Sequence, residues 1–528
     1  MRAPEIFFAV CGSRLSAPFG VPDEKRLGGF SPSTNGSGSE GRWFRKGAVV
    51  LAAVTTPVLT RRRQAWALVV IVIGVLVAAI DTTIVILALP TMMRSLHASL
   101  ANIVWVSMSY LLIITLLATQ VGRLGDMFGR VRLYELGFVI FVIGSLLCGV
   151  SVNESMLIGF RIVQGIGGAL ISANSGAVIA DTFEPQRRGR AYGYTSVGWN
   201  VGAIVGVLLG GILTTYFSWR YIFLINVPIG LTAVIVAWFV LQDRGERSAR
   251  HMDWGGMVLL GLGLFLVLLT MVRMTSQPFS DALAVPLIAG PLLLVAFAIV
   301  ERRQSSPMLQ WRLFHNRLVS ASLLAAFFQS LGNFAVLFLV IMYLQGLRQL
   351  TPLHASLLLV PSYLVGAGLG PVSGRLADKA GPALPATAGL AIQAVALFLY
   401  GHLGLRTPLW QVAGISIING MGAAGFFPAN NAAIMKGSPR GSYGIASGML
   451  RTFANIGMVL SFASALLVAS AQIPKHLAFA IFVGTTSLTG HLMASFNHGI
   501  HAAFYLAIAL LAVAALFSAL RGTATDEL

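Results

Sequence analysis

The stretch G-R-L-G-D-M-F-G at residues 122–129 returns as G-R-L-A-D-K-A-G at residues 374–381, 252 residues later. Each copy lies between two long apolar runs, and the same offset carries residue 66, where the first apolar run starts, onto residue 318, where the ninth starts. The chain therefore contains two similar halves. Two parallel halves are typical of membrane transporters, which hold their binding site near the middle of the bilayer, between the halves.

The composition places the chain in a lipid bilayer. Hydrophobic residues make up 56% of its 528 residues, whereas Asp, Glu, Lys and Arg together make up 10%. A soluble globular protein carries about 25% charged residues, so this chain has too few to cover a surface in water. The composition excludes a soluble cytosolic enzyme, and it also excludes disorder over most of the length.

Fourteen apolar runs are long enough to cross the bilayer as helices, which takes about 20 residues each. Gly, Ala and Pro recur inside these runs, as membrane helices tolerate, and the alternating ten-residue strands of a membrane barrel are not seen. The sequence therefore predicts an all-α membrane protein with spans at residues 66–90, 103–121, 133–150, 157–181, 191–213, 221–241, 254–273, 283–300, 318–345, 352–373, 383–403, 409–435, 442–470 and 501–520.

The order of the spans predicts the domains, and the basic residues predict the orientation. We expect six-helix bundles at residues 64–245 and 304–528 and two linker spans within 246–303. Residues 1–63 are expected to be a disordered cytoplasmic tail or a product of translation from too early a start. If the N-terminus is inside, the inner loops and C-terminal tail hold three times as many Lys and Arg residues as the outer loops. The positive-inside rule then predicts a multi-pass protein of the inner or plasma membrane with both termini in the cytoplasm.

Four further motifs accompany the repeated stretch, which continues to Arg130. They are D-T-T-I-V at 81–85 leading to A-L-P at 88–90, R-I-V-Q-G at 161–165, W-R-Y-I-F-L-I-N-V-P at 219–228 and Y-L-Q at 343–345. With these motifs in this order, residues 64–520 resemble the major facilitator superfamily, and the fourteen spans resemble its fourteen-helix drug/proton antiporter branch of multidrug efflux type. The resemblance implies the major facilitator fold: two six-helix bundles plus two extra transmembrane helices.

Asp81 is the acidic residue that lies deep inside a predicted span. An ionised carboxylate at the bilayer centre costs at least about 2.5 kcal/mol, and burial favours the neutral form. Asp81 is therefore a candidate acceptor for a proton or for a cationic substrate. Arg161 lies within about 6 Å of the same depth, and the resemblance implies that it takes part in proton transfer. Helix capping by Asp81 and a static buried pair remain alternatives.

The two copies of the repeated stretch are predicted to form gating loops at the cytoplasmic face. Their glycines permit tight backbone geometry, and the resemblance implies that Asp126 meets the N-terminus of a helix in the other half, where the helix dipole favours a carboxylate. The alternative is that the loops only determine topology. The candidate gating residues are Gly122, Arg123, Asp126, Gly129 and Arg130 in the first copy and Gly374, Arg375 and Asp378 in the second.

Small residues in the fifth span predict close helix packing. The resemblance implies an antiporter motif G-x-x-x-G-P-x-x-G-G here, but Val207 stands at the proline position. Two other positions also depart from the family pattern: Ile86 replaces an Asn, and Ala454 replaces an Arg, with Arg451 one turn earlier. The glycines of the motif are Gly202, Gly206, Gly210 and Gly211.

Several polar and aromatic residues are candidates to contact substrate, because they lie on spans expected to line the central cavity. Buried hydrogen bonds between helices, or a place for Trp near the membrane surface, are the alternatives. The chain has no phosphate-binding G-x-x-x-x-G-K-[ST] sequence, metal-ligand spacing or catalytic set. We therefore expect no enzyme activity, cofactor, metal or nucleic-acid partner. The candidate substrate residues are Gln164, Trp199, Asn200 and Asn333.

These features predict a secondary active transporter that exports small hydrophobic or cationic drug-like compounds in exchange for protons, by alternating access within the lipid bilayer. A transporter of this type would confer drug resistance. Val207 keeps open a proton-coupled uptake permease of the same fold. A polytopic membrane sensor without transport is the remaining alternative.

Overall fold

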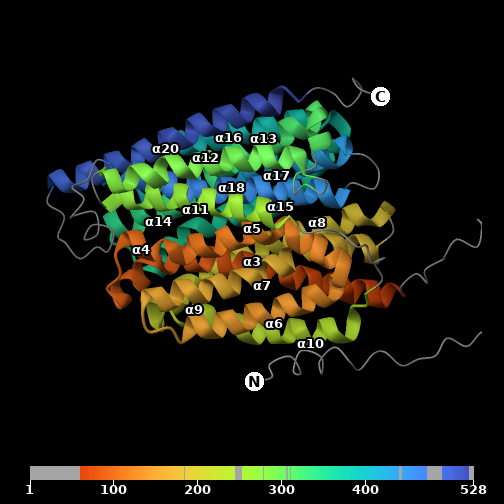
Figure 1. Cartoon of the computed structure of the whole chain (residues 1–528). Coiled ribbons are helices and arrows are strands. Elements are labelled where there is room, and N and C mark those ends of the chain that lie inside the picture. The colour runs from red at the N-terminus through yellow and green to blue at the C-terminus, as the bar shows by residue number, and fades with distance from the viewer. Residues whose placement is uncertain are drawn as a thin grey trace, which may run out of the picture. The chain divides into compact units, whose positions relative to one another are not determined.

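The structure, a computed structural model, describes residues 60–183, 185–243, 253–276, 279–304, 307, 309, 311–438, 443–471 and 490–521. Its regular elements within these ranges are all helices, most of them long and running side by side (Figure 1). Fourteen helical stretches of the described chain are long and apolar enough to cross a membrane. The prediction of an all-α membrane protein with fourteen spans is therefore confirmed. The expectation for residues 1–59 lies outside the described residues.

The first half of the chain forms six spans. Two of its spans are accompanied by single-turn helices at their ends, and α7 begins at a cap in which Asn153 Oδ1 accepts a hydrogen bond from the backbone N–H of Met156. This cap satisfies one of the N–H groups that a helix start leaves without a partner. The helices are α3 (Arg61–Leu96), α4 (Leu100–Ile103), α5 (Trp105–Phe128), α6 (Arg130–Gly149), α7 (Glu154–Thr182), α8 (Pro185–Tyr216), α9 (Tyr221–Leu224) and α10 (Asn226–Val240).

The two linker spans and the second half follow in the same way. The linker spans are α11 (Trp254–Ser276) and α12 (Asp281–Arg303), and α11 packs against both α5 of the first half and α18 of the second. Helix α11 therefore borders the seam between the halves, and α12 packs against α11. The second half consists of η2 (Trp311–His315), α13 (Arg317–Asn333), α14 (Val336–Ile341), η3 (Met342–Leu347), α15 (Pro352–Ala380), α16 (Ala383–Tyr400), α17 (Leu409–Gly437), α18 (Tyr443–Ser470) and α20 (Gly490–Ala519).

The ninth span is interrupted, although the sequence predicts one continuous helix over 318–345. The α-helix ends at Asn333 and resumes as α14, and η3 is a π-helical turn. The Ser461 hydroxyl of α18 accepts a hydrogen bond from the freed N–H of Ala335 at 3.0 Å. A membrane helix can break where a neighbouring side chain satisfies the backbone in this way.

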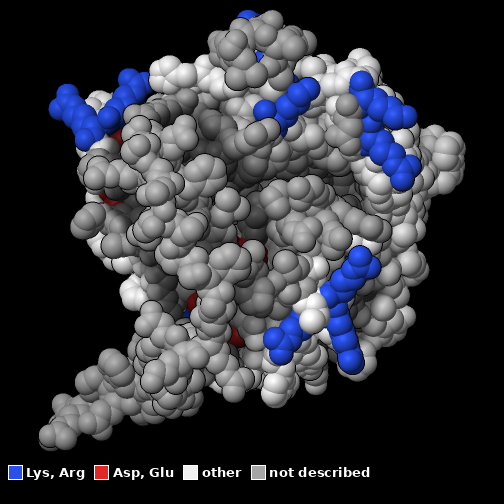
Figure 2. All heavy atoms as spheres, turned by 90° about the vertical axis from the view of Figure 1, so that its right-hand side faces the viewer, with Lys and Arg blue, Asp and Glu red and all other residues white. Residues whose placement is uncertain are grey.

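The first described span begins and the last one ends on the same face of the molecule, on the right of Figure 1. We call this the terminal face, and the other end of the bundle the opposite face. Figure 2 views the terminal face directly and shows Lys and Arg side chains spread around its rim, whereas the Asp and Glu side chains seen there are recessed. The positive-inside rule associates basic residues near span ends with the cytoplasmic side of a membrane.

Candidate proton-coupling site

Asp81 lies in the middle of α3, and its side chain is completely buried inside the N-terminal bundle. Its Oδ2 accepts a hydrogen bond from Arg161 Nη1 of α7 at 2.8 Å, and the same two groups form an ion pair. Its Oδ1 accepts from Gln164 Nε2 at 2.8 Å and from Asn226 Nδ2 at 3.2 Å. Three donors from two other helices therefore surround one carboxylate, as the burial of a charge requires.

Arg161 is held from several sides and is 1% exposed. Its Nε donates to the backbone carbonyl of Val106 at 2.9 Å, and its Nη1 donates to Gln164 Oε1 at 2.7 Å. The guanidinium lies over the ring of Tyr110 at 4.1 Å, a cation–π contact that is stronger when water is absent. Arg161 therefore ties α3 and α7 to the start of α5.

Gln164, expected in the substrate cavity, is instead fully buried in this network. Its Nε2 donates to Ser145 Oγ of α6 at 2.7 Å as well as to Asp81, and its Oε1 also accepts from the Cys148 thiol at 3.8 Å. Both ends of its amide are occupied by protein groups. The structure therefore assigns Gln164 to the neighbourhood of Asp81.

Asn226 belongs to the network but is absent from the candidates chosen from the sequence. It begins α10, is fully buried, and leaves its Oδ1 without a hydrogen-bond partner. A sequence signal for it exists, because Asn226 is a polar amide inside the otherwise apolar stretch 222–228 of the motif at 219–228. Sequence spacing could not show that this segment turns inward toward α3.

The corresponding core of the C-terminal half holds a neutral pair. Gln329 Nε2 of α13 donates a hydrogen bond to Gln393 Oε1 of α16 at 3.3 Å, and both side chains are buried. The fully buried ion pair Asp81–Arg161 lies in the N-terminal half, so the two halves differ in their buried polar groups although their helices repeat.

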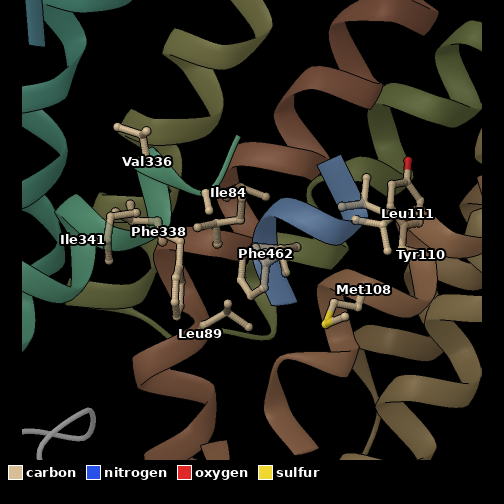
Figure 3. Close-up of a cluster of buried hydrophobic side chains, with 14 of the residues drawn as sticks. Ile84, Leu89, Met108, Tyr110, Leu111, Val336, Phe338, Ile341 and Phe462 are labelled. Atoms are coloured by element: carbon tan, nitrogen blue, oxygen red, sulfur yellow. The ribbon is translucent and has the colours of Figure 1, made fainter. Parts of the chain in front are cut away.

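Near the opposite face, the two halves close on each other through apolar side chains. Figure 3 shows Leu89 of α3 beside Phe338 of α14 and Phe462 of α18. The ring centroids of the two phenylalanines are 4.5 Å apart. A small apolar cavity lies between the two halves here and is lined by Leu89, Pro90, Met93, Ile103, Val104, Phe338 and Met342. We call these residues together with Phe462 the apolar seal.

Two hydrogen bonds cross between the halves beside the apolar seal. Gln345 Nε2 donates to the carbonyl of Leu87 at 3.4 Å, and the N–H of Leu353 donates to Thr215 Oγ1 at 3.3 Å. Toward the terminal face, Arg451 Nη1 donates to the carbonyl of Ser172 at 3.1 Å. The side chain of Arg451 is exposed, so this crossing is more accessible than the part-buried hydrogen bonds at the opposite face.

The repeated stretches are helical rather than looped over most of their length. Helix α5 continues to Phe128 and α15 to Ala380, and each ends at one glycine with positive φ, Gly129 (φ 107°) or Gly381 (φ 83°). Helix α5 therefore extends seven residues beyond the predicted end of its span at residue 121, because it ends at the positive-φ Gly129 and not where the apolar run ends.

The structure describes the side chains of some of the candidate gating residues. Arg130 Nη1 lies 2.6 Å from Asp181 Oδ1 of α7, in a pair that is about one quarter exposed. Asp243, which follows α10, accepts from the N–H of Val131 at 3.4 Å. Arg375 and Gly374 lie at the exposed end of α15. The side chains of Arg123, Asp126 and Asp378 lie outside the described residues.

The glycines of α8 face two different neighbours. A Cβ atom on Gly202, Gly206 or Gly210 would lie 2.2–3.0 Å from atoms of α3, whereas one on Gly211 would lie 2.5 Å from Ser356 Oγ of α15. Three glycines thus let α8 approach α3 closely, and the fourth lets it approach the other half. Val207, at the position of the family's proline, is fully buried, and α8 runs through it without a break.

The other three candidate substrate residues lie apart from the Asp81 network. Asn200 faces the C-terminal half, since a Cβ on Gly366 of α15 would lie 3.4 Å from its Oδ1. Trp199 is 41% exposed, and Asn333 lies half-buried at the break that follows α13. Asn200 thus lies where the halves meet, and Asn333 lies where a span is interrupted.

Comparisons with known proteins identify the family and the fold of the chain. Residues 71–462 match the profile of the Major Facilitator Superfamily. The tetracenomycin C resistance and export protein of Streptomyces glaucescens is 29% identical over 413 residues, 76% of this chain and 75% of that protein. The riboflavin transporter RibZ of Clostridioides difficile is 30% identical over 400 residues, 75% of this chain and 87% of that protein. A bacterial homologue of the human lysosomal transporter Spinster, solved in an inward-facing and unoccupied conformation, shares the fold with a TM-score of 0.62 and 17% identity, over 88% of this chain and 98% of that one.

Proposed function

The chain belongs to the Major Facilitator Superfamily, and we propose that this membrane transporter exports small hydrophobic or cationic drug-like compounds in exchange for protons. The observation that carries the proposal is the buried pair of Asp81 and Arg161. A carboxylate that is sealed from water inside a membrane protein is a group that can take up a proton. An ion gradient then supplies the energy, about 2.3 kcal/mol per charge for each 100 mV of membrane potential.

The contacts between the halves support a cycle of alternating access. The apolar seal and the bonds Gln345–Leu87 and Leu353–Thr215 hold the opposite face closed. For export, the halves would part there and close at the terminal face, where Arg451 already reaches Ser172. Arg161 contacts Asp81 and also α5, next to Ile103 and Val104 of the apolar seal. Neutralising Asp81 would weaken its attraction to Arg161 and so loosen one wall of the seal.

The proposed arrangement in the cell follows from the charge distribution. We place the N-terminal bundle at 64–245, the linker spans within 246–303 and the C-terminal bundle at 304–528, with the terminal face in the cytoplasm of the inner or plasma membrane. Substrate would bind between the halves near Asn200 and Asn333. Exposed Trp199 offers an aromatic face that attracts cations.

A proton-coupled uptake permease is the second candidate. Two observations favour it: Val207 replaces the proline of the antiporter motif, and a relative is named for riboflavin transport. In that case protons and substrate would move in the same direction. The two candidates therefore differ in the sign of the pH gradient that accumulates substrate inside vesicles.

The experiment uses inside-out membrane vesicles that contain the full-length protein and a fluorescent lipophilic cation, with neutral riboflavin as a second probe. Export predicts uptake into vesicles that are acidic inside, and loss of this uptake in Asp81→Asn at equal protein level. Asp281→Asn, which changes an exposed acid in the first turn of α12, is the control and should transport normally. Accumulation driven by the inverse gradient would favour the permease, and unchanged transport by Asp81→Asn would remove Asp81 from the mechanism.

A further inference from the structure

The hydrogen bonds around Asp81 suit only its ionised form. Arg161 Nη1, Gln164 Nε2 and Asn226 Nδ2 all donate to the carboxylate. A protonated carboxyl group has an O–H that must donate in turn. A buried O–H without an acceptor costs about 1–3 kcal/mol, so a proton-carrying Asp81 needs an acceptor that its present partners do not offer in these orientations.

Most neighbours of Asp81 cannot supply this acceptor. The Arg161 guanidinium has only donors, and Gln164 Oε1 already accepts from Arg161 and from the Cys148 thiol. The remaining ionisable group packed here is Tyr110 of α5, whose ring lies against Arg161 and whose hydroxyl, also without a partner, lies near Gly168, where a Cβ would be 2.8 Å away. Of the two unused acceptors, the one on a side chain already bonded to the carboxylate belongs to Asn226 of α10.

Asn226 has the acceptor that is missing. Its Nδ2 lies 3.2 Å from Asp81 Oδ1, and its Oδ1 is fully buried with no hydrogen-bond partner. The nitrogen and oxygen of an amide have nearly the same shape, so a half-turn of the amide exchanges donor for acceptor without repacking its neighbours.

We propose that Asn226 is a positioning residue for the proton, whose amide donates to ionised Asp81 and turns to accept from protonated Asp81; this rests on the proposed proton coupling. The proton from water bonds to Asp81 Oδ1, and the carboxyl group loses its charge. The amide of Asn226 turns, and its Oδ1 accepts the new O–H. Arg161 keeps its hydrogen bonds to Val106 and Gln164. When the proton leaves to water, the amide turns back.

The test is infrared difference spectroscopy of the full-length protein in lipid vesicles, recorded between high and low pH. The carboxyl C=O band of protonated Asp81 is identified by its loss in Asp81→Asn. We expect Asn226→Leu to shift this band to higher frequency, the direction for a carboxyl group that has lost its hydrogen-bond acceptor. Gln393→Leu, which changes a buried amide of the other half, should leave the band in place.

The outcomes separate this proposal from the proposed function. An Asp81 band that is present in Asn226→Leu at the wild-type frequency would overturn the role of Asn226 and leave proton binding by Asp81 intact. If no band depends on Asp81 at any pH, the proton-coupling function fails as well. If Asn226→Leu does not fold, wild-type protein with ¹³C-labelled asparagine serves instead. An amide band that changes together with the Asp81 band supports the proposal, and an unchanged amide spectrum overturns it.

Discussion

Asp81 Oδ2 and Arg161 Nη1 lie 2.8 Å apart, and neither side chain is more than 1% exposed. The pair connects two helices of the N-terminal bundle rather than the two halves. A buried pair adds little net stability compared with apolar side chains, but removing one partner leaves an uncompensated charge. Arg161 of this pair contacts Tyr110 and Val106 at the start of α5, which adjoins the apolar seal. A change in the charge of Asp81 can therefore affect the seal through Arg161.

The first prediction concerns the cost of breaking this pair. Arg161→Met leaves an ionised carboxylate buried without its partner, which should lower the free energy of unfolding by about 3–5 kcal/mol. The double variant Asp81→Asn/Arg161→Met removes both charges and should regain most of that loss, while transport stays absent. Thermal unfolding of detergent-solubilised protein followed by size-exclusion chromatography measures both. Additive losses in the double variant would contradict an energetic coupling between the two residues.

The second prediction concerns the packing of α8 on α3. A Cβ on Gly206 would lie 2.2 Å from Thr83 Oγ1 and 2.9 Å from the Ile80 backbone, so Gly206→Ala must push the helices apart. We expect a loss of about 1–3 kcal/mol of stability, measured as a lower unfolding temperature. Gly193→Ala is the matched control on the same helix, because a Cβ there meets nothing within 4 Å. Equal effects of the two substitutions would contradict the close approach.

The third prediction separates the glycines of the repeated stretch. Gly129 has φ 107°, and a Cβ on it would collide with the carboxylate of Asp243, so Gly129→Ala should cost about 1–3 kcal/mol from backbone strain. Gly122 is helical and a Cβ there meets nothing, so Gly122→Ala should be neutral or slightly stabilising. Unfolding temperatures of both variants decide the matter, and a tolerated Gly129→Ala would refute the strained turn.

The architecture was predictable because its signals are long and redundant. Each span extends over many apolar residues, and the repeated stretch predicts the division into halves without any contact information. Helix ends were less accurate: the polar segment up to Phe128 was expected to be a loop but is helical, and the ninth span breaks at Asn333. Such breaks depend on partners from other helices, here Ser461, which no local pattern reveals.

The candidate site was predictable in its charges but not in its amides. Asp81 and Arg161 stand out because ionisable groups in a membrane are costly, and their depths along the helices, within about 6 Å of each other, made contact possible. Gln164 and Asn226 are neutral, and amides in spans serve packing and function alike. Whether an amide turns toward Asp81 or toward the space between the halves depends on helix rotation. That is why Gln164 was expected in the cavity and Asn226 was missed.

The last prediction tests whether the contact at the opposite face must open during transport. Thr215 Oγ1 and the N–H of Leu353 are 3.3 Å apart across the halves, so the variant Thr215→Cys/Leu353→Cys should be joined by a short thiol cross-linker. Alternating access requires these residues to separate, so the cross-link should abolish transport and cleavage of a reducible linker should restore it. The single cysteine variants treated in the same way are the controls; native Cys148 is buried, and Cys11, the other native cysteine, is replaced by Ser in every variant. Transport that continues at full rate with the halves linked here would show that substrate does not pass through the apolar seal.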